Sequence, residues 1–409
     1  MTISKLWTIA YRDLGRNKRR TIISLTAVAL GLALLILMSG FIAGVMDGSL
    51  QNSIRLNTGH VQVRAESYEE AKLSLLWSDL IQNPTALIDQ TQNIPEIKAA
   101  TPVLWSGGVL STMQESVSVK INGVDTQSSI YGFLDEGLIE GQTPSPEARG
   151  EILIGLRLAS NMGIGVGSRI SLFVGQSEGD PREGIFTVSG IYSTGIPTYD
   201  ESTIFMPLSQ AQAFTGAGER ASAIIVMLNN SADAEKVAGL LKGPGIKTLT
   251  WEEMHAYLLV TIQSGMSFYY MMYGIVMLVV AVIIANTLLM AVFERIREMG
   301  ILSALGMKSR QILAMMLLEA TALALAGILI GILLGSALVK IFESTGIAIG
   351  ESAASVAGGV ALSSTVYTKL MLADVIGLSL AMFIIILLAS FYPARFASRL
   401  EPVAALHAQ

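Results

Sequence analysis

Residues 21–46 read TIISLTAVALGLALLILMSGFIAGVM, and this stretch decides the fold class. It holds 26 residues without a single charge, between the basic pair Arg19-Arg20 and Asp47. A bilayer core about 30 Å thick is crossed by about 20 apolar residues in a helix. The apolar core of a cleaved signal peptide is shorter, at about 7 to 15 residues. We therefore expect an uncleaved membrane-spanning helix.

Three further charge-poor windows predict additional spans. They cover Met254–Phe293, Ala320–Val339 and Val375–Ala394. The window Met254–Phe293 is too long for one crossing. The helix of the window Ala320–Val339 is expected to begin nearer Gln311, which would put Glu319 inside it. In the whole chain 52% of residues are hydrophobic and 14% are charged, against about 25% charged in soluble domains. We therefore predict an α-helical membrane protein with four transmembrane helices.

Lysine and arginine predict which side of the membrane each loop occupies. They gather before the first span and between the second and third, at Lys5, Arg12, Arg16, Lys18, Arg19, Arg20, Arg295, Arg297, Lys308 and Arg310. Short loops rich in these residues stay in the cytoplasm. Both termini and the 294–310 loop are therefore expected to be cytoplasmic, whereas residues 47 to about 265 and 341–371 are expected outside.

The segment before the first span, residues 1–20, has its own apolar pattern. Apolar side chains recur at helical spacing at Ile3, Leu6, Trp7, Ala10, Tyr11 and Leu14. With basic residues on the other faces, this pattern predicts a short helix lying in the cytoplasmic interface of the membrane. A simple basic flank of the first span is the alternative.

The region between the first two spans is long enough to fold, and residues 57–250 are expected to form an inserted α+β extracytoplasmic domain. Strands are predicted at 60–63, 117–121, 151–154, 169–174, 184–188, 202–206 and 223–228. Helices are predicted at 68–80, 84–90, 156–162, 208–214 and 232–241. Because the chain has no cysteine, this domain is expected to fold without disulfides.

The segments on either side of this domain predict long helices. No proline occurs over residues 251–299, and a continuous helix of about 48 residues would reach about 70 Å, more than twice the bilayer core. The first span likewise continues towards Ile54. Residues 21–56 and 251–293 would then each combine a span with a stalk that carries movement to the external domain. The other segments are 294–310, a cytoplasmic loop helix; 311–340, the third span; 341–371, an external loop; 372–394, the fourth span; and 395–409, a cytoplasmic tail.

Motifs for intrinsic chemistry are missing from the sequence. No G-x-x-x-x-G-K-[ST] run is present, and the segment Gly243–Thr248 has the wrong spacing and a proline without an amide donor. His60, His255 and His407 lie far apart, so metal ligation has no local spacing to support it. A net charge of -5 argues against a nucleic-acid partner. We expect no catalytic residues, no metal and no cofactor bound by this chain.

The loop ERIREMGILSALG at residues 294–306 has the pattern of a short docking helix. Met299, Leu302 and Leu305 follow at intervals of three, which indicates an apolar ridge. Charges for a partner come from Glu294, Arg295, Arg297 and Glu298. A solvated basic loop is the alternative, but it would need neither an apolar ridge nor glycines at its turns.

This loop resembles the coupling-helix signature of MacB/LolC/FtsX-type ABC transporter permeases. Three other segments are similar to the same family, and the similarity extends from end to end of the chain. They are Arg16-Asn-Lys-Arg-Arg-Thr21, Gly59-His-Val-Gln-Val63, and Tyr392-Pro-Ala-Arg395 with Glu401-Pro-Val-Ala-Ala-Leu406. The resemblance implies a MacB-like periplasmic core domain and a loop that enters a groove of a separate ATPase. The implied coupling residues are Glu294, Arg297, Glu298, Met299, Gly300, Leu302, Ala304, Leu305 and Gly306.

The resemblance also implies an assembly in the bacterial cytoplasmic (inner) membrane. Such permeases form dimers, of identical subunits or of two paralogues, and bind two ABC ATPase subunits that hold the ATP and Mg. ATP binding closes the ATPases, the long helices transmit the motion, and the external domains act on cargo outside. Cargo is a lipoprotein or a hydrophobic or peptide molecule, and it need not cross the inner membrane.

Two features lie inside the predicted spans. Small residues recur at every fourth position, at Gly40, Gly44 and Gly48 in the first span and at Gly327, Gly331 and Gly335 in the third. This spacing lets helix backbones approach closely, either at a subunit interface or within one subunit. Glu319 is an acidic group near the cytoplasmic end of a span, where it is costly and functional, or where it reaches the interface.

Three functions are compatible with the resemblance. Lipoprotein release is favoured by the segment Gly59–Val63 and by the absence of a fused ATPase. One subunit of that subgroup recruits a periplasmic carrier with an extended hairpin, but the connection Gly175–Gly184 looks short and polar here. Either a partner subunit would then hold the hairpin, or no carrier would be involved. MacB-like efflux of peptides, macrolides or lipids, with a periplasmic adaptor, is the first alternative, and an FtsX-like regulator of envelope hydrolases is the second.

Overall fold

The structure is a computed structural model, and it describes residues 18–177, 179–350 and 362–399. The chain divides into two compact units. The helical unit holds the chain up to Met46, Ile262–Ile347 and the chain from Tyr367, whereas the sheet unit holds Asp47–Thr261 and Ala348–Val366. Most of the interfacial helix predicted over residues 1–20, and residues 400–409 of the predicted tail, lie outside the described residues.

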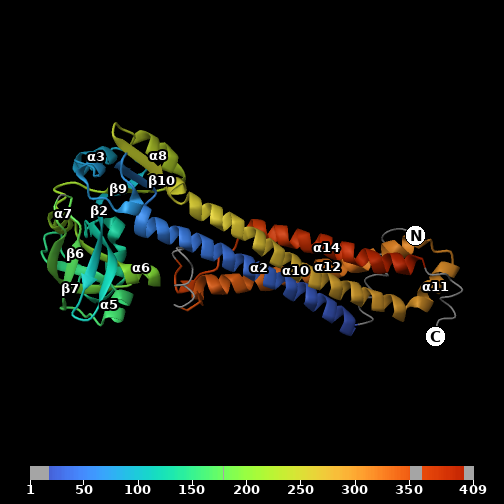
Figure 1. The fold of residues 1–409 in the computed structure, drawn as a ribbon. Helices are drawn as coiled ribbons and strands as arrows, with labels where there is room; N and C mark the ends of the chain where they lie inside the picture. Colours follow the sequence, from blue (N-terminus) through green and yellow to red (C-terminus); the bar gives the residue numbers. More distant parts are fainter. Residues whose placement is uncertain (1–17, 178, 351–361, 400–409) are drawn as a thin grey trace. The chain divides into compact units, whose positions relative to one another are not determined.

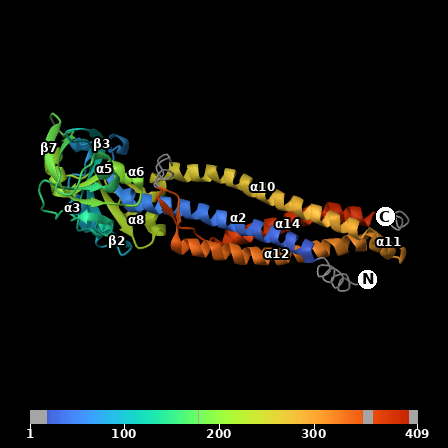
Figure 2. The ribbon, with the colours of Figure 1, turned by 90° about the horizontal axis from the view of Figure 1, so that it is seen from below.

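Long apolar helices build the helical unit. They are α2 (Lys18–Ser53), α10 (Ala256–Glu294), α12 (Ser309–Thr345) and α14 (Leu372–Ser398). Among the described residues these four are long and apolar enough to cross a membrane, α2 together with the π-helical turn Ile54–Thr58 that follows it. Figures 1 and 2 both draw them side by side. The short helix α11 (Ile296–Ala304) connects α10 to α12.

Each long helix buries one face and exposes the other. Val28, Leu32 and Leu35 of α2 recur at helical spacing and are fully buried, as expected for one packed stripe. They pack in one cluster with Tyr273, Met277, Val280, Ile284 and Leu288 of α10, Ala320, Ala324 and Ile328 of α12, and Val375, Leu378, Met382 and Ile386 of α14. The opposite faces are apolar and more than half exposed, at Leu30, Leu34, Leu329, Leu333, Ile376 and Leu380. An apolar exterior of this kind suits lipid as the solvent.

The sheet unit is built on a ten-stranded mixed sheet. Its strands are β1 (Val61–Ala65), β2 (Ile97–Ser111), β3 (Ser116–Val124), β4 (Leu138–Gly141), β5 (Glu151–Gly155), β6 (Arg169–Val174), β7 (Arg182–Tyr192), β8 (Thr203–Pro207), β9 (Ala223–Leu228) and β10 (Ile246–Thr250). Their order is β10-β1-β9-β2-β3-β8-β5-β7-β4, and β6 pairs with β2 and β7. β3 pairs with β8, and β5 with β7, in parallel. The helices of this unit are α3 (Pro84–Thr91), α4 (Phe133–Glu136), α5 (Leu156–Met162), α6 (Pro197–Ser202), α7 (Leu208–Thr215), α8 (Ala234–Leu240) and α9 (Trp251–Met254).

Strand β2 ties two parts of this sheet together. Its first half pairs with β9 from Ile97 to Val103, and its end pairs with β6 on the same edge. β3 runs along the other edge from Val103 to Ser111. On the edge of β2 that pairs with β9 and β6, Trp105 lies between these two partners. Its amide donates to Ser222 Oγ at 3.0 Å. A side chain thus satisfies a buried amide that no strand reaches.

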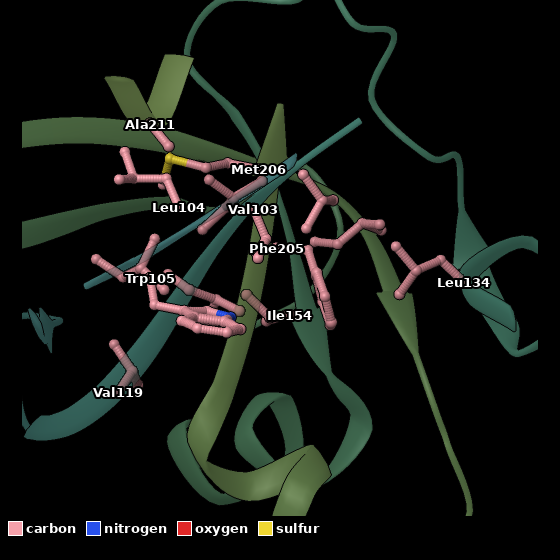
Figure 3. Close-up of a cluster of buried hydrophobic side chains, with 14 of the residues drawn as sticks. Val103, Leu104, Trp105, Val119, Leu134, Ile154, Phe205, Met206 and Ala211 are labelled. Carbon is pink, nitrogen blue, oxygen red and sulfur yellow. The ribbon is translucent and has the colours of Figure 1, made fainter. Parts of the chain in front are cut away.

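Phe205 of β8 lies in the middle of the sheet-unit core, among the side chains drawn in Figure 3. It is fully buried. The rings of Tyr131, Phe133 and Tyr192 meet it edge-on, with centroids 6.2, 6.1 and 5.3 Å away. Edge-to-face contacts of this kind add to the free energy gained by burial.

All seven predicted strands are present, and β6 and β9 have the predicted bounds. Strands β2, β4 and β10 were not predicted. Pro102, Gly107 and Gly108 interrupt the apolar pattern of β2, and such residues argue against a central strand when sequence alone is considered. Only its partners β9, β3 and β6 make it one.

The helix predicted over residues 68–80 is wrong. This segment forms two 3-10 turns, Glu70–Lys72 and Trp77–Asp79. Leu73 between them adopts φ 45°, which ends the first turn because a left-handed residue cannot continue a right-handed helix. Ser74 Oγ then accepts from the amide of Leu76 at 3.3 Å, a local bond that competes with the helical pattern.

The continuous helix predicted over residues 251–299 is interrupted twice. His255 separates α9 from α10, and its ring bonds Trp251 O and Ser53 Oγ, each at 2.8 Å. Arg295, at φ -117° and ψ 17°, separates α10 from α11. In addition, α12 and α14 extend to Thr345 and Ser398, beyond the expected ends at 340 and 394.

Candidate functional site

Helix α11 is a short, sharply bounded helix between two long ones. It ends in a hydrogen-bond pattern in which the amide of Gly306 donates to Ser303 O and that of Met307 to Leu302 O, each at 3.0 Å. This is the Schellman arrangement, which needs a left-handed residue just past the helix. Gly306 supplies it with φ 91°. The glycine that closes the predicted docking loop therefore sets the length of α11.

The three residues of the predicted apolar ridge, Met299, Leu302 and Leu305, do not share one exposed face of α11. Met299 is buried among Val292, Ile312, Met316, Ala394 and Ala397, so it packs inside this chain and offers no surface to a partner. Gly300 is also buried. Residues three apart on a helix rotate by about 60° per step, so the series from Met299 through half-buried Leu302 winds from the inside to Leu305, which is 80% exposed.

The exposed side of α11 is formed by residues four apart. Arg297, Ile301 and Leu305 are all exposed, and Glu298 and Ala304 flank them. These five residues are called the outer face of α11. Sequence reasoning missed Ile301, although the spacing of four from Arg297 to Leu305 could have revealed it. The outer face combines three apolar side chains with one charge of each sign.

Beside α11, a buried charge network joins three of the long helices. Arg20 Nη2 of α2 donates to Glu319 Oε1 of α12 at 2.9 Å. Arg20 Nη1 lies 3.5 Å from Glu294 Oε2, on the last residue of α10. The side chains of Glu319, Arg20 and Glu294 are 2%, 13% and 46% exposed. Glu319 was predicted to lie in a helix, and it does, but its partner Arg20 was not foreseen.

Five of the six glycines in the two series pack parts of the same chain together, whereas a Cβ on Gly48 would meet open space. A Cβ on Gly327, Gly331 or Gly335 of α12 would come within 2.7 to 2.9 Å of Val28, of Ala29 and Leu32, or of Ile36 on α2. Gly40 meets Val339 in the same way, and Gly44 meets the carbonyl of Tyr367. Of the two uses left open by the sequence, packing within one subunit is the one seen at these five glycines.

In the sheet unit, an acidic side chain lies under a cavity of about 280 Å³. Asp200 is 2% exposed and accepts hydrogen bonds from Ser193 Oγ, Thr194 Oγ1 and the amide of Thr194. Burial raises the pKa of Asp200, although these bonds oppose the shift. The carboxylate organises the turn before α6, and this accounts for its hydrogen bonds.

The segments considered for metal or phosphate binding have structural roles. His60 Nδ1 accepts from the amide of Leu228 at 3.0 Å, and burial lowers the pKa of His60. Gly243 and Ile246 bridge a turn that leads into β10. His407 lies outside the described residues. Among the residues that the structure describes, no group of three or more histidine and acidic side chains is arranged to hold a metal.

Long apolar helices, a ten-stranded mixed sheet whose strands follow α2 and precede α10 in the sequence, and a short helix with one exposed face between α10 and α12 define a class of membrane permease. The family model described as MacB-like periplasmic core domain matches residues 21–243, more than half of the chain. The model described as FtsX-like permease C-terminal matches residues 270–402. The chain therefore belongs to the family of ABC transporter permeases of the LolC/LolE/MacB/FtsX type, as the sequence resemblance predicted.

Several named relatives align with almost the whole of this chain. It is 25% identical to the lipoprotein-releasing system transmembrane protein LolE of Haemophilus influenzae, over 94% of this chain and 93% of that protein. It is 24% identical to LolC of Neisseria meningitidis serogroup B, over 97% and 98%. Identity to the macrolide export ATP-binding/permease protein MacB of Nitrobacter winogradskyi is also 24%, over 97% of this chain but 59% of that protein.

Proposed function

We propose that this chain is the transmembrane subunit of an ATP-driven transport complex. In this proposal the outer face of α11 binds a separate ABC ATPase. The observation that carries the proposal is the geometry of α11. Met299 anchors its inner side in an apolar cluster, while Arg297, Ile301 and Leu305 stay exposed on the other side. A helix whose one face is packed against its own chain, and whose other face exposes apolar and charged side chains, is suited to docking into a groove.

In this proposal α11 lies in the cytoplasm. Basic residues lie in α11 and on either side of it, at Arg295, Arg297, Lys308 and Arg310, and basic short loops stay on the cytoplasmic side. Both termini are then cytoplasmic, and the sheet unit is periplasmic. Two such subunits, identical or paralogous, bind two ATPases that hold ATP and Mg, and α2 and α10 pass the ATPase movement to the sheet units.

The cargo we propose is a lipoprotein released from the inner membrane. Both the LolE and LolC relatives are covered nearly end to end by this chain, and their names describe lipoprotein release. One observation favours a second candidate, MacB-like export. The connection between β6 and β7 spans only residues 175–181, which leaves no long hairpin here to recruit a carrier.

Purification from the native membrane tests both parts of the proposal. Mass spectrometry should identify an ABC ATPase with this chain, and ATP turnover should be measurable in the complex. A lipoprotein or its carrier in the complex supports release, whereas an adaptor supports export. A complex without any ATPase would overturn the proposal.

A charge on the outer face of α11 tests the docking site. Leu305→Asp should abolish stimulated ATP turnover because it puts a charge in the apolar part of the contact, and Leu302→Asp, on a half-buried residue beside it, should do the same. Met113→Asp is the matched control, since Met113 is a fully exposed apolar residue of the sheet unit. Unchanged turnover in Leu305→Asp, with the control also unchanged, would remove this face as the docking site.

A break in α10 tests the transmission of movement. Val260→Pro removes a backbone donor and clashes with the preceding turn, at a cost of about 3 kcal/mol or more to the local helix. ATP should still be hydrolysed but cargo handling should fail, while Val260→Ala leaves both intact. Full cargo handling in the proline variant would contradict a rigid α10.

A further inference from the structure

Three charged residues that the sequence analysis treated separately lie close together in the helical unit. Arg20 comes from the basic segment before the first span, Glu319 is the acidic residue inside the third, and Glu294 opens the docking loop. The contacts of Arg20 with the two carboxylates bring them together, 299 residues apart in the case of Glu319. These three residues are called the Arg20 bridge.

We propose that Arg20 is a positioning residue that ties the start of α11 to α2 and α12. A displacement of α11 by a bound ATPase is then passed to α2 through a charge contact, in addition to the path along α10. This inference rests on the proposed docking of an ATPase at α11. It adds the means by which α2, which has no direct chain connection to α11, receives that movement.

The two contacts of the bridge differ in strength. Glu319 is almost completely buried and accepts a hydrogen bond from Arg20 at 2.9 Å. A buried carboxylate without its cation is strongly unfavourable, so this contact is kept in any position of the helices. Glu294 is nearly half exposed and lies 3.5 Å from Arg20. Water can replace this second contact at little cost, which allows it to form and break.

The Nη1 atom of Arg20 supplies a second, independent observation. It is buried, and among the residues that the structure describes it finds no hydrogen-bond partner, although Glu294 Oε2 is within ion-pair distance. Charge-assisted N–H to O bonds are about 2.7 to 2.9 Å long. A shift of less than about 1 Å at the end of α10 would complete the bond. The bridge is thus built for a loose and a tight arrangement.

The buried apolar cluster that holds α11 in place does not include α2. In the described part of the chain, the buried cluster around Met299 is formed by residues of α10, α12 and α14, and none of its members comes from α2. The contact between Glu294 and Arg20 therefore links α2 to the residue next to Arg295, where α10 gives way to α11. Arginine suits this role because its planar fork can serve two carboxylates at once, whereas the lysine ammonium acts as a point charge.

The decisive variant is Arg20→Lys, which keeps the charge beside buried Glu319 and hence the fold. A purely structural role of Arg20 would be satisfied by this lysine. Positioning would fail, because the ammonium cannot reach both carboxylates in the same way. Arg19→Lys is the matched control, since Arg19 is the exposed neighbour on the same turn of α2. Glu294→Gln is a second variant that leaves the buried contact untouched.

A spin label on α11 reads its position directly. The chain has no cysteine, so Ser303→Cys gives one labelling site on α11 that lies off the outer face. In the full chain in lipid nanodiscs, Arg20→Lys and Glu294→Gln should raise the mobile fraction of the label, whereas Arg19→Lys should not. In the unlabelled complex with its co-purified ATPase, the same two variants should lower stimulated ATP turnover about five-fold or more.

The outcomes separate this proposal from the proposed function. An unchanged label in Arg20→Lys and Glu294→Gln overturns the positioning role, whatever the ATPase does. A mobile label with full stimulation overturns the transmission through α2. If the label responds as expected but unmodified protein carries no ATPase, the positioning of α11 stands and the proposed docking function is the part that fails.

Discussion

The helical unit and the sheet unit each bury one side of their elements, but they differ in what they expose. Leu329 on α12 and Ile185 on β7 are both 61% exposed. Around Leu329 the outward positions continue as leucine, at Leu325 and Leu333. Around Ile185 polar side chains are mixed with apolar ones. Ser171 pairs with Ile185 across the strands and donates to Glu183, whereas Phe173, which pairs with Glu183, is itself 39% exposed.

The comparison teaches that an exposed fraction has a meaning only together with the solvent. In the sheet unit an exposed isoleucine is one of a few apolar side chains among polar ones at a watery surface, which is ordinary. In the helical unit a continuous exposed leucine face would be unstable in water and is satisfied by lipid. The packed sides, in contrast, obey the same rules in both units.

The largest effect is expected from a packed side chain. Phe205→Ala in the sheet-unit core should lower the free energy of unfolding by about 3 to 5 kcal/mol, because it leaves a cavity among three aromatic rings. Phe173→Ala on exposed β6 is the control and should cost much less. Denaturant unfolding of the full chain in detergent, followed by fluorescence of buried Trp105, measures both. Equal losses would mean that Phe205 is not at the centre of the core.

Two matched aspartate substitutions test whether lipid covers the exposed face of the helical unit and water covers that of the sheet unit. Leu329→Asp should cost about 3 kcal/mol of membrane insertion, since aspartate at a helix centre is unfavourable by about that amount. Ile185→Asp, at equal exposure, should cost about 1 kcal/mol or less of sheet stability. The fraction of protein recovered in alkali-washed membranes gives the first value and denaturant unfolding the second. Normal insertion of the Leu329 variant would argue against lipid at this face.

A smaller effect with opposite signs is expected from two glycines of the helical unit. Gly331→Ala should destabilise by about 1 to 3 kcal/mol, because the added methyl group would lie 2.9 Å from Leu32 and from the carbonyl of Ala29. Gly377→Ala on α14 meets open space and should gain up to about 1 kcal/mol from helix propensity. Thermal unfolding in detergent distinguishes the two, and a gain in both variants would refute close packing of α2 on α12.

The smallest effect concerns pH in the sheet unit. Burial raises the pKa of Tyr68 to about 12 from its usual 10.0. The neutral phenol is therefore preferred in the folded state, and the stability that depends on it is fully present below pH 10 and lost as the pH rises towards 12. Tyr68→Phe should make the loss of stability over this window shallower. Alkaline titration of unfolding by near-ultraviolet circular dichroism measures the slope, and parallel curves would contradict the shift.

Much of the fold could be predicted because its signals are local. Period-two runs revealed seven strands, among them β6 and β9 at their observed bounds. Strand β2 could not be predicted in this way. Its Pro102, Gly107 and Gly108 weaken the local signal, and it becomes the central strand because β9, β6 and β3 supply its hydrogen bonds.

The candidate site divides in the same manner. The short helix at residues 296–304 could be predicted from the composition of the loop and from its closing Gly306, which acts through the local Schellman pattern. Met299, which was predicted to belong to the docking ridge, packs inside the chain, because the direction of each side chain depends on which neighbours cover α11. A spacing of three and a spacing of four both look helical in sequence, but only the packed cluster around Met299 decides which face is inside.

The class of this protein follows from its sequence alone, since four long charge-free runs are unstable in water and can be counted residue by residue. The roles of their few polar and small residues became clear only from how the helices pack. Glu319 gained Arg20 as a partner across 299 residues, and Gly331 gained its purpose from α2. Burial and ion pairing depend on atoms brought close by folding, and the distance along a chain holds no information on which atoms those will be.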